Sequence, residues 1–508
     1  MRKFLWLSGV ACVALGVAVA SSATAPSDPG GPFCRRAPEL VQLPAEQPVP
    51  ILQQQTYGGA VGDSMASTPP VLAAPPPPPA PPPPPPMPER GGEIMVTGSR
   101  VDSARTARPE AAPPAPPPPA TMSSPRAAST VADGRYERRN APPAGLLTAG
   151  DHDDLLNPML YARYVARAAR ALGQQIGGLP KVDTRRSLTI AVEDASGRGA
   201  PFVPVTISCS DGNSLTLSTL ADGRVVLFPA LDRLSSRVRI TAGGVSRNVD
   251  IGDGAGGQVQ TLVAHSPAQV VRKFDLMIAL DSTGSMGDEI EFLKSELQSI
   301  LGDIGRAYPG LDIRVGLVAY RDIGDDYVTR TDRLGSAIGT IQNALDRTSG
   351  MGGGDMPEAM DQALIRAVGQ DWRADAVKSL LLVADAPPHD DLQGKAFAAA
   401  EAARARRIQI VPVAASGVDD RAEYFMRAVA AATQSRYIFL TDDSGIGNPH
   451  AEPDVDCYVV TQLAGAIRRV LASQISGQRV EPYPEEVVRT SGRYNHGRCI
   501  LPADFRVQ

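Results

Sequence analysis

The segment Asp281-Ser282-Thr283-Gly284-Ser285 places one carboxylate and two hydroxyl groups at alternate positions. It directly follows the apolar run Phe274 to Leu280, whose composition is typical of a buried parallel strand. Three such oxygen groups can converge on one hard cation and still leave part of its coordination shell open. The spacing therefore predicts a metal-dependent binding site in which Asp281, Thr283 and Ser285 are ligands.

The elements around this segment must position it. Between residues 270 and 475 strand and helix patterns alternate, which predicts a doubly wound α/β domain with a mostly parallel sheet. The expected strands are Phe274 to Leu280, Ile313 to Tyr320, Tyr327 to Arg333, Ser379 to Ala384, Ile408 to Ala414 and Arg436 to Leu440. The expected helices are Asp288 to Ile304, Leu334 to Thr348, Pro357 to Val368, Gly394 to Arg406, Arg421 to Thr433 and Cys457 to Ser473.

The predicted topology brings three loops to one rim of the sheet. The loop Arg321 to Asp326 is too short for a crossover, so the strand after it should be an antiparallel edge strand. The next helix then returns the chain to the carboxyl ends of the parallel strands, where ligand sites of open α/β sheets lie. The loops Asp281 to Ser285, Gly352 to Glu358 and Asp385 to Asp390 should therefore meet there.

This segment resembles a von Willebrand factor type A domain with a metal-ion-dependent adhesion site. The family has Asp-x-Ser-x-Ser on the first loop and an Asp after the fourth strand, and this chain has Asp281-x-Thr283-x-Ser285 and Asp385. The second loop departs from the family's Gly-Gly-Thr-x-Thr. Met356 stands near the usual Thr, and a thioether is a poor ligand for Mg²⁺. Asp355 is the obvious substitute.

The resemblance implies a cation, a ligand set and a partner. Mg²⁺ would be held by Asp281, Thr283, Ser285 and Asp385, with Asp355 as a further ligand that would shift preference toward Ca²⁺ or Mn²⁺. A carboxylate from a protein partner would complete the coordination shell, as in the family. The competing interpretation is that the two Asp side chains cap helices and the hydroxyls bond backbone amides in a turn. Whether Asp355 is a direct ligand stays open.

Enzymatic interpretations fit the residues less well. A phosphatase of the haloacid dehalogenase type needs a second Asp two residues after the first, where Thr283 stands. A serine hydrolase needs Gly-x-Ser-x-Gly, and Thr283 to Gly287 supplies only its second half. We therefore expect a protein that is not an enzyme, with no catalytic residues and no organic cofactor.

The amino terminus predicts export. Residues 1–25 combine Arg2 and Lys3 with a long apolar run, as in a secretory signal peptide, although about 20 apolar residues also suffice for an uncleaved anchor. The expected location is the periplasm or cell surface of a Gram-negative bacterium. A net charge of −5 and the lack of a basic stripe argue against nucleic-acid binding.

Composition divides the remaining chain. With 47 Pro and 48 Gly in 508 residues, the chain is expected to hold two or three folded units and a disordered proline-rich linker at 26–143, a stiff spacer. Within it, Glu93 to Arg100 resembles a segment of TonB-dependent receptors and is a candidate docking strand for a TonB-like partner. A helical segment is expected at 144–185 and a tail without clear periodicity at 476–508.

Residues 186–265 contain seven short alternating segments separated by turn residues, which predict a β-sandwich. They resemble the carboxypeptidase-regulatory or transthyretin-like modules of exported bacterial proteins.

Beyond the leader the cysteines are Cys34, Cys209, Cys457 and Cys499. Sequence leaves three complete pairings open. We favour Cys457 with Cys499 and expect Cys209 to be a buried thiol.

Together these patterns predict an exported, non-enzymatic binding protein whose type A domain engages a protein partner through a divalent metal. The alternative is a periplasmic structural or assembly factor that acts through the β-sandwich or the linker motif without metal-dependent binding.

Overall fold

The computed structural model describes residues 32–46, 147–179, 181–252, 257–354, 356–445, 450 and 452–505. All of them belong to one of the chain's two compact units, Met1–Val49 with Arg138–Gln508. The predicted signal at 1–25, the candidate docking strand at 93–100 and the predicted ligand Asp355 lie outside the described residues. Among the described helices, none has both the length and the apolar character needed to cross a bilayer.

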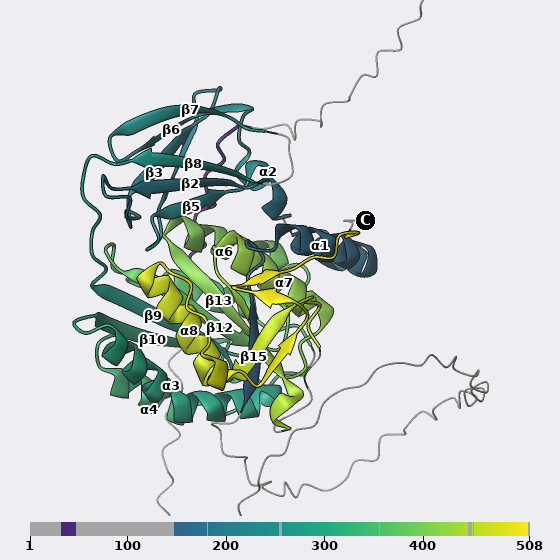
Figure 1. The fold of residues 1–508 in the computed structure, drawn as a ribbon. Helices are drawn as coiled ribbons and strands as arrows, with labels where there is room; N and C mark the ends of the chain where they lie inside the picture. Colours follow the sequence, from purple (N-terminus) through teal and green to yellow (C-terminus); the bar gives the residue numbers. More distant parts are fainter. Residues whose placement is uncertain are drawn as a thin grey trace, which may run out of the picture. The chain divides into compact units, whose positions relative to one another are not determined.

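A nine-stranded sheet forms the centre of this unit, in the order β11-β10-β9-β12-β13-β14-β1-β15-β16. Figure 1 labels β9, β10, β12, β13 and β15 of this sheet. Neighbouring strands from β10 through β9, β12 and β13 to β14 are parallel, and β11 is an antiparallel edge strand, as predicted. The strands are β1 (Thr148–His152), β9 (Lys273–Asp281), β10 (Asp312–Tyr320), β11 (Thr329–Gly335), β12 (Val377–Ala384), β13 (Ile408–Ala414), β14 (Tyr437–Thr441), β15 (Tyr458–Gln462) and β16 (Arg489–Ser491).

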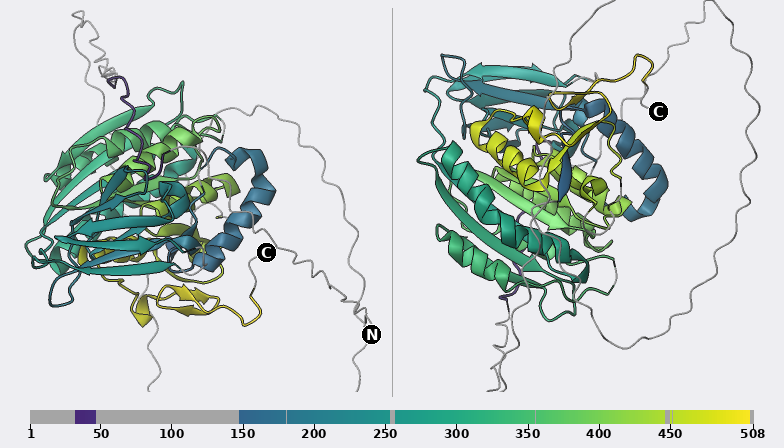
Figure 2. Two further views of the ribbon diagram at one scale, coloured as in Figure 1. Left: turned by 90° about the horizontal axis from the view of Figure 1, so that it is seen from above. Right: turned by 60° about the horizontal axis from the view of Figure 1, so that its bottom comes forward.

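Helices cover both faces of this sheet (Figures 1 and 2). One apolar core contains residues of α1, α5, α6 and α7, and another contains residues of α3, α4 and α8. This confirms the predicted doubly wound architecture. The helices are α1 (Pro158–Leu172), α3 (Gly287–Ala307), α4 (Ile338–Asp346), α5 (Met360–Val368), α6 (Gln393–Ala405), α7 (Asp420–Ala432) and α8 (Leu463–Ser476).

Three strands of the sheet, β1, β15 and β16, are absent from the sequence-based prediction. β1 lies in a stretch predicted as turn and helix, yet it is inserted antiparallel between β14 and β15. Its Gly150 is required, because a Cβ there would lie 2.5 Å from the Phe439 ring. The helix predicted from Cys457 begins only at Leu463, since β15 occupies the residues before it. In the tail, β16 pairs with β15, and β17 (Tyr494–Asn495) pairs with β18 (Arg498–Cys499).

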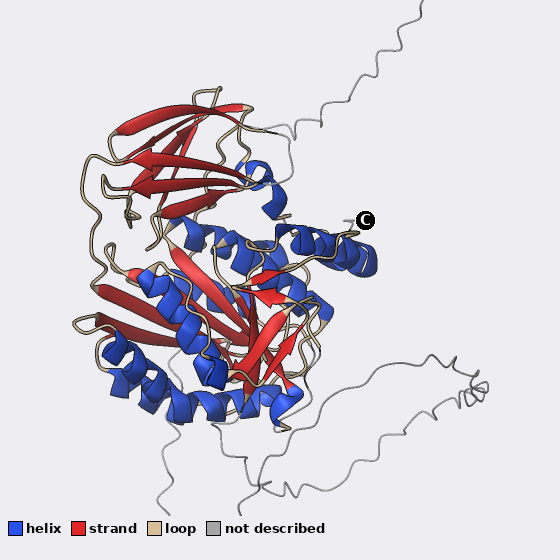
Figure 3. Cartoon of the chain, viewed as in Figure 1, coloured by secondary structure: helices blue, strands red, loops and turns tan. Residues whose placement is uncertain are grey.

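The predicted β-sandwich is present (Figure 3). Strands occur at all seven predicted positions. A three-stranded sheet, β5-β2-β8, and a four-stranded sheet, β4-β3-β6-β7, share one apolar core. The elements are β2 (Leu188–Glu193), β3 (Pro204–Ser208), β4 (Ser214–Ser218), β5 (Arg224–Leu227), α2 (Pro229–Asp232), β6 (Arg237–Ala242), β7 (Val245–Asp250) and β8 (Gln258–Val263).

Residues 32–46, which we call the strap, correct the prediction of a continuous disordered linker at 26–143. A disulfide joins Cys34 to Cys209, so the prediction of a free buried thiol at Cys209 is wrong. Sequence missed this pair because Cys34 lies in a stretch without periodicity. The predicted disulfide between Cys457 and Cys499 is confirmed.

The strap contacts both the sandwich and the large sheet domain. Leu40 and Leu43 pack against the core that contains α5 to α7. The Glu46 carboxylate accepts hydrogen bonds from the Thr331 backbone N–H at 3.0 Å and from its hydroxyl at 2.6 Å. Because Thr331 belongs to the edge strand β11, Glu46 covers part of an otherwise open strand edge.

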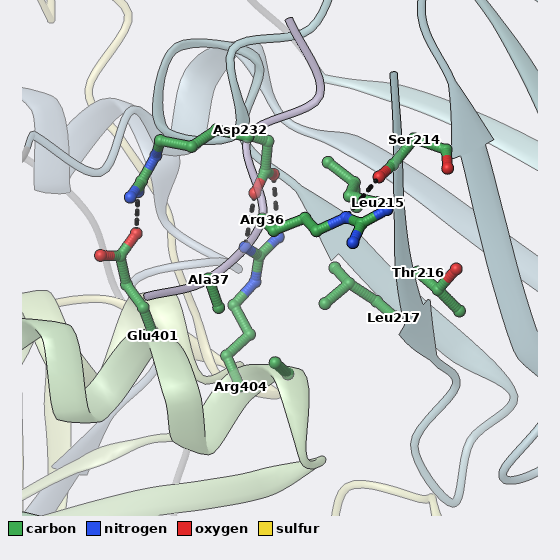
Figure 4. A pocket seen from close by; sticks show the side chains of 11 residues that line it. Arg36, Ala37, Ser214, Leu215, Thr216, Leu217, Asp232, Glu401 and Arg404 are labelled. Carbon is green, nitrogen blue, oxygen red and sulfur yellow. Dashed lines mark hydrogen bonds and ion pairs between the residues drawn. The ribbon is translucent and has the colours of Figure 1, made fainter. Parts of the chain in front are cut away.

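Two ion pairs join α2 of the sandwich and the strap to α6 around a pocket of about 390 Å³ (Figure 4). Arg404 contacts Asp232 at 2.7 Å, and both side chains are buried. Glu401, also on α6, pairs with Arg35 of the strap. Removing one member of such a pair would leave a buried charge without its partner, which is strongly destabilising. These contacts hold the sandwich, the strap and α6 together.

Candidate functional site

The predicted rim exists because several strands end in register. Tyr320 of β10 pairs with Asp281 of β9, and Val383 of β12 pairs with Leu280. The loops that follow these strands therefore leave the sheet at the same edge. The Gly284 backbone N–H also donates to Gly352 O at 3.1 Å, which fastens the first loop to the glycine-rich loop.

Asp281 is fully buried, and its two carboxylate oxygens differ in their contacts. The Tyr320 hydroxyl is near enough to lower the pKa of Asp281, but no hydrogen bond of normal geometry reaches Oδ2. Its Oδ1 accepts hydrogen bonds from the Thr283 backbone N–H at 3.0 Å and from the Thr283 hydroxyl at 2.7 Å. Its Oδ2 is buried without a hydrogen-bond partner. The hydroxyls of Thr283 and Ser285 lie 3.5 Å apart. Three predicted ligands are thus brought together by one short loop.

Asp385 completes this arrangement from the end of β12. It is 5% exposed, and its Oδ1 also lacks a hydrogen-bond partner. Burial, and then the charge of Asp385, raise the pKa of Asp281 to about 7. Burial likewise raises the pKa of Asp385, against the opposing effect of a hydrogen bond from Ser285. The two carboxylates therefore destabilise one another's charged forms, and a cation between them would relieve this repulsion.

Glu358 is a third buried carboxylate at the rim and is absent from the predicted ligand set. It is 3% exposed and its Oε2 has no hydrogen-bond partner. Burial, and then the charges of Asp281 and other rim carboxylates, raise its pKa to about 9. A Cβ on Gly353 would lie 2.9 Å from Glu358 Oε1 and 3.1 Å from Thr283 Cβ, so this glycine permits the close approach of the two loops.

The sequence contained a signal for Glu358, since it closes the glycine-rich loop that departs from the family motif. From sequence, Asp355 is instead assigned as the ligand that replaces the family's Thr, because Asp355 is nearer to that position. Met356 is 39% exposed and borders the site rather than filling it. The Glu358 backbone N–H donates to Pro387 O at 3.0 Å, which ties the loop to the residues that follow Asp385.

These side chains surround an open hollow of about 690 Å³, bordered by the three predicted loops together with Ser416 and Gly417. Within the described ranges, no three His, Cys, Asp or Glu side chains gather into a typical metal-binding group. The residues present are instead two hydroxyls and carboxylates with orphaned buried oxygens. Such an all-oxygen set fits Mg²⁺, which usually keeps several waters and takes only one or two carboxylates directly.

Helix capping does not account for the orphaned oxygens. The residue before α3 is Met286, and no side chain caps that helix. Asp281 does support the turn through its Oδ1, as the competing interpretation requires. Its Oδ2 and the Oδ1 of Asp385 have no role in that interpretation, and burying an unpaired charged oxygen is costly.

A hydrogen-bonded chain borders the hollow at the loop after β13. Ser416 Oγ lies 3.1 Å from His450 Nε2, and His450 Nδ1 lies 2.7 Å from Asp442 Oδ1, an order that resembles a Ser-His-Asp triad. However, the Ser416 hydroxyl and backbone N–H both donate to Glu289 Oε1, at 2.7 and 2.9 Å. The hydroxyl proton is directed at the Glu289 carboxylate, so these contacts fix the loop.

The fold and site together define an open α/β domain with an oxygen-lined rim. Residues 275–449 match the family model described as von Willebrand factor type A domain, so this part of the chain is a type A domain. The match covers less than half of the chain.

Other similarities are partial. An ariadne-like RING finger protein of Acanthamoeba polyphaga mimivirus is 34% identical over 120 residues, which span 23% of this chain and 11% of that protein. Among solved structures, the open pilus adhesin SpaC of Lactobacillus rhamnosus GG is 15% identical with a TM-score of 0.29, covering 41% of this chain and 30% of the adhesin. The chain thus matches well under two thirds of either protein.

A conserved hypothetical protein, BatB, of Bacteroides thetaiotaomicron is 14% identical with a TM-score of 0.27, covering 40% of this chain and 98% of its own. An aerotolerance-related membrane protein of Bacteroides fragilis is 13% identical with a TM-score of 0.26, covering 40% and 100%. At this level the similarities bear on neither ligand nor partner.

Proposed function

We propose that this chain is a non-enzymatic binding protein whose type A domain engages a protein partner through a divalent cation. Asp281, Thr283, Ser285 and Asp385 hold the cation, with Glu358 beside them. When bound, the cation supplies an electrophilic centre whose open position accepts an oxygen ligand, such as a carboxylate of the partner. The protein residues hold that centre at the floor of an open hollow.

One observation carries this proposal. Asp281 Oδ2 and Asp385 Oδ1 are both buried without a hydrogen-bond partner, on two loops that leave the same rim. Buried carboxylates in proteins are normally paired with a cation or hydrogen-bonded. No described cation contacts either of them, so a bound metal ion is the simplest partner for both.

Export forms part of the proposal. The two disulfides support it, because such bonds persist mainly in oxidising compartments outside the cytosol. The predicted leader at residues 1–25 provides the route. The expected location is therefore the periplasm or the cell surface.

Calorimetric titration of the purified mature chain with MgCl₂, MnCl₂ and CaCl₂ tests the metal. We expect binding of at least one cation, loss of that binding in Asp385→Asn, and unchanged binding in Asp391→Asn, an exposed carboxylate on the same loop. Heat of binding for none of the three cations would contradict the proposal. Pull-downs from cell-envelope extract, in Mg²⁺ and in EDTA, then identify partners that both EDTA and Asp385→Asn release.

A further inference from the structure

The surface around the hollow has an uneven charge. The loops of the rim carry Asp322, Asp325, Asp326, Asp390 and Asp391 in addition to the buried carboxylates of the site. The side chains of Asp326 and Asp390 are 81% and 57% exposed, and Asp391 is exposed as well. Exposed carboxylates are therefore present on the loops that border the hollow.

The cationic groups of these loops offset that charge only in part. Arg321 lies 3.6 Å from Asp326, whose side chain is still 81% exposed. The Arg321 side chain is 6% exposed, and its guanidinium donates inward to Ser282 O at 3.2 Å and to Ser349 O at 3.1 Å. His389 lies 2.6 Å from Asp322. Arg421, at the start of α7, contacts Asp419 at 2.9 Å and Asp390 at 3.4 Å.

The same loops also expose large apolar side chains. Ile323 is 56% exposed, Met351 is 57% exposed and Met356 is 39% exposed. Ile323 lies on the loop after β10, and the two methionines lie on the glycine-rich loop. Flexible methionines adapt to varied partner surfaces, and apolar anchors within a polar surround are a common plan for interfaces.

The exposed aspartates also bear on the kind of partner. A partner that brought only carboxylates would add to their negative charge. A partner that surrounds its metal ligand with lysine or arginine would be attracted by them.

We propose that the rim selects a basic protein surface, one that presents an apolar side chain flanked by Lys or Arg. This inference rests on the proposed function, since the basic surface docks around the metal site. Charge complementarity is the argument for this occupant, because the exposed carboxylates oppose acidic proteins, nucleic acids and anionic lipid surfaces alike.

Two labelled amphipathic peptides of equal length and equal leucine spacing test the inference, one with lysine and one with glutamate at the polar positions. Fluorescence anisotropy with the full mature chain in Mg²⁺ should show binding of the lysine peptide and much weaker binding of the glutamate peptide. Removing three rim charges, by Asp326→Asn, Asp390→Asn and Asp391→Asn together, should weaken the lysine peptide at least about threefold. Ile323→Ser with Met351→Ser should also weaken it.

The matched control removes three exposed carboxylates away from the rim, by Asp371→Asn, Glu485→Gln and Asp504→Asn. It should leave peptide affinity unchanged. Equal binding of the two peptides, or an equal loss in the rim and control variants, would overturn the inference while Mg²⁺ titration of the same samples still supports the metal site. A chain that binds no divalent cation would overturn the proposed function, and with it this inference.

Discussion

The two ends of β9 carry two aspartates that are equally buried but whose pKa values are shifted in opposite directions. Asp275, near the start of the strand, and Asp281, at its end, are both 0% exposed. Burial alone would raise the pKa of Asp275, but hydrogen bonds from Arg314 and Arg373 outweigh it and hold that pKa below 3.8. Burial and the charge of Asp385 raise the pKa of Asp281 to about 7.

The difference shows how a buried carboxylate that stabilises the fold can be distinguished from one that belongs to a binding site. Arg314 contacts Asp275 at 2.8 Å and Arg373 contacts it at 2.7 Å, so the protein supplies the cations itself. At Asp281 the nearest charged neighbours are further carboxylates, and one oxygen is left without a partner. A buried acid that is fully paired stabilises the fold, whereas one that is half paired beside other acids indicates a place for an external cation.

The largest expected effect is on stability at the paired end. Asp275→Asn should lower the free energy of unfolding by about 3 kcal/mol, because it leaves two partly buried arginines without the buried carboxylate that they share. Asp281→Asn should lower it little or raise it when metal is absent, since a repulsive charge is removed. Urea unfolding of both variants in EDTA measures this. An equal loss in the two would erase the distinction between the ends of β9.

A bound metal ion should stabilise the folded protein only through the carboxylates at the Asp281 end of β9. At a free Mg²⁺ concentration one hundred times its dissociation constant, the free energy of unfolding should rise by about 2.7 kcal/mol. The rise should persist in Asp275→Asn and be absent in Asp385→Asn. Thermal and urea unfolding with and without Mg²⁺ provide the measurement, and a rise in Asp385→Asn would show that the cation binds elsewhere.

Glu358 sharpens the comparison within the site. Glu358→Gln should weaken metal binding about tenfold, or about 1.4 kcal/mol, because a charged oxygen beside the cation is lost. Met356→Thr, which restores the hydroxyl of the family motif, should change affinity less. Calorimetry on both variants decides whether Glu358 or the position of Met356 serves the second loop. If Met356→Thr increases metal affinity by more than Glu358→Gln decreases it, the position of Met356 provides the ligand of the second loop.

The smallest expected effect is the loss at low pH of the stability that Asp275 contributes. The folded pKa of Asp275 lies below its ordinary value, so its stabilising contribution is complete above about pH 4 and is lost as pH falls through the folded pKa. The stability difference between wild type and Asp275→Asn should therefore narrow below pH 4, by less than about 1.4 kcal/mol per pH unit. Unfolding in EDTA across this range measures it. A constant difference would mean that Asp275 stabilises by shape and not by charge.

Sequence patterns identified the parts of this fold that carry strong periodicity. β9, β12 and β13 are rich in apolar residues, and their shared direction was enough to bring Asp281 and Asp385 to one rim. β1 escaped detection because Thr148–His152 is short, contains Gly150 and gains its identity from pairing with residues almost 300 positions away. β15 escaped because it continues into α8 without a break.

The site was predictable where spacing is local. Asp281, Thr283 and Ser285 share one turn, so their convergence follows from the chain itself. Glu358 was not assigned, because its approach depends on the absence of a side chain at Gly353 and on the loop after β12. Neither contact can be inferred from a single sequence, and the ion pair between Arg404 and Asp232 cannot be inferred either.

The strap changes how a pulling force would travel through this protein. Glu46 is bonded to β11, and Leu147 O accepts a hydrogen bond from the Leu463 backbone N–H at 2.8 Å, so the chain leaves and re-enters one folded unit around residues 47–146. Load applied ahead of the strap enters that unit at the Cys34–Cys209 disulfide. Between that point and the carboxyl end of the chain, the disulfide gives the load a covalent path that does not include residues 47–146.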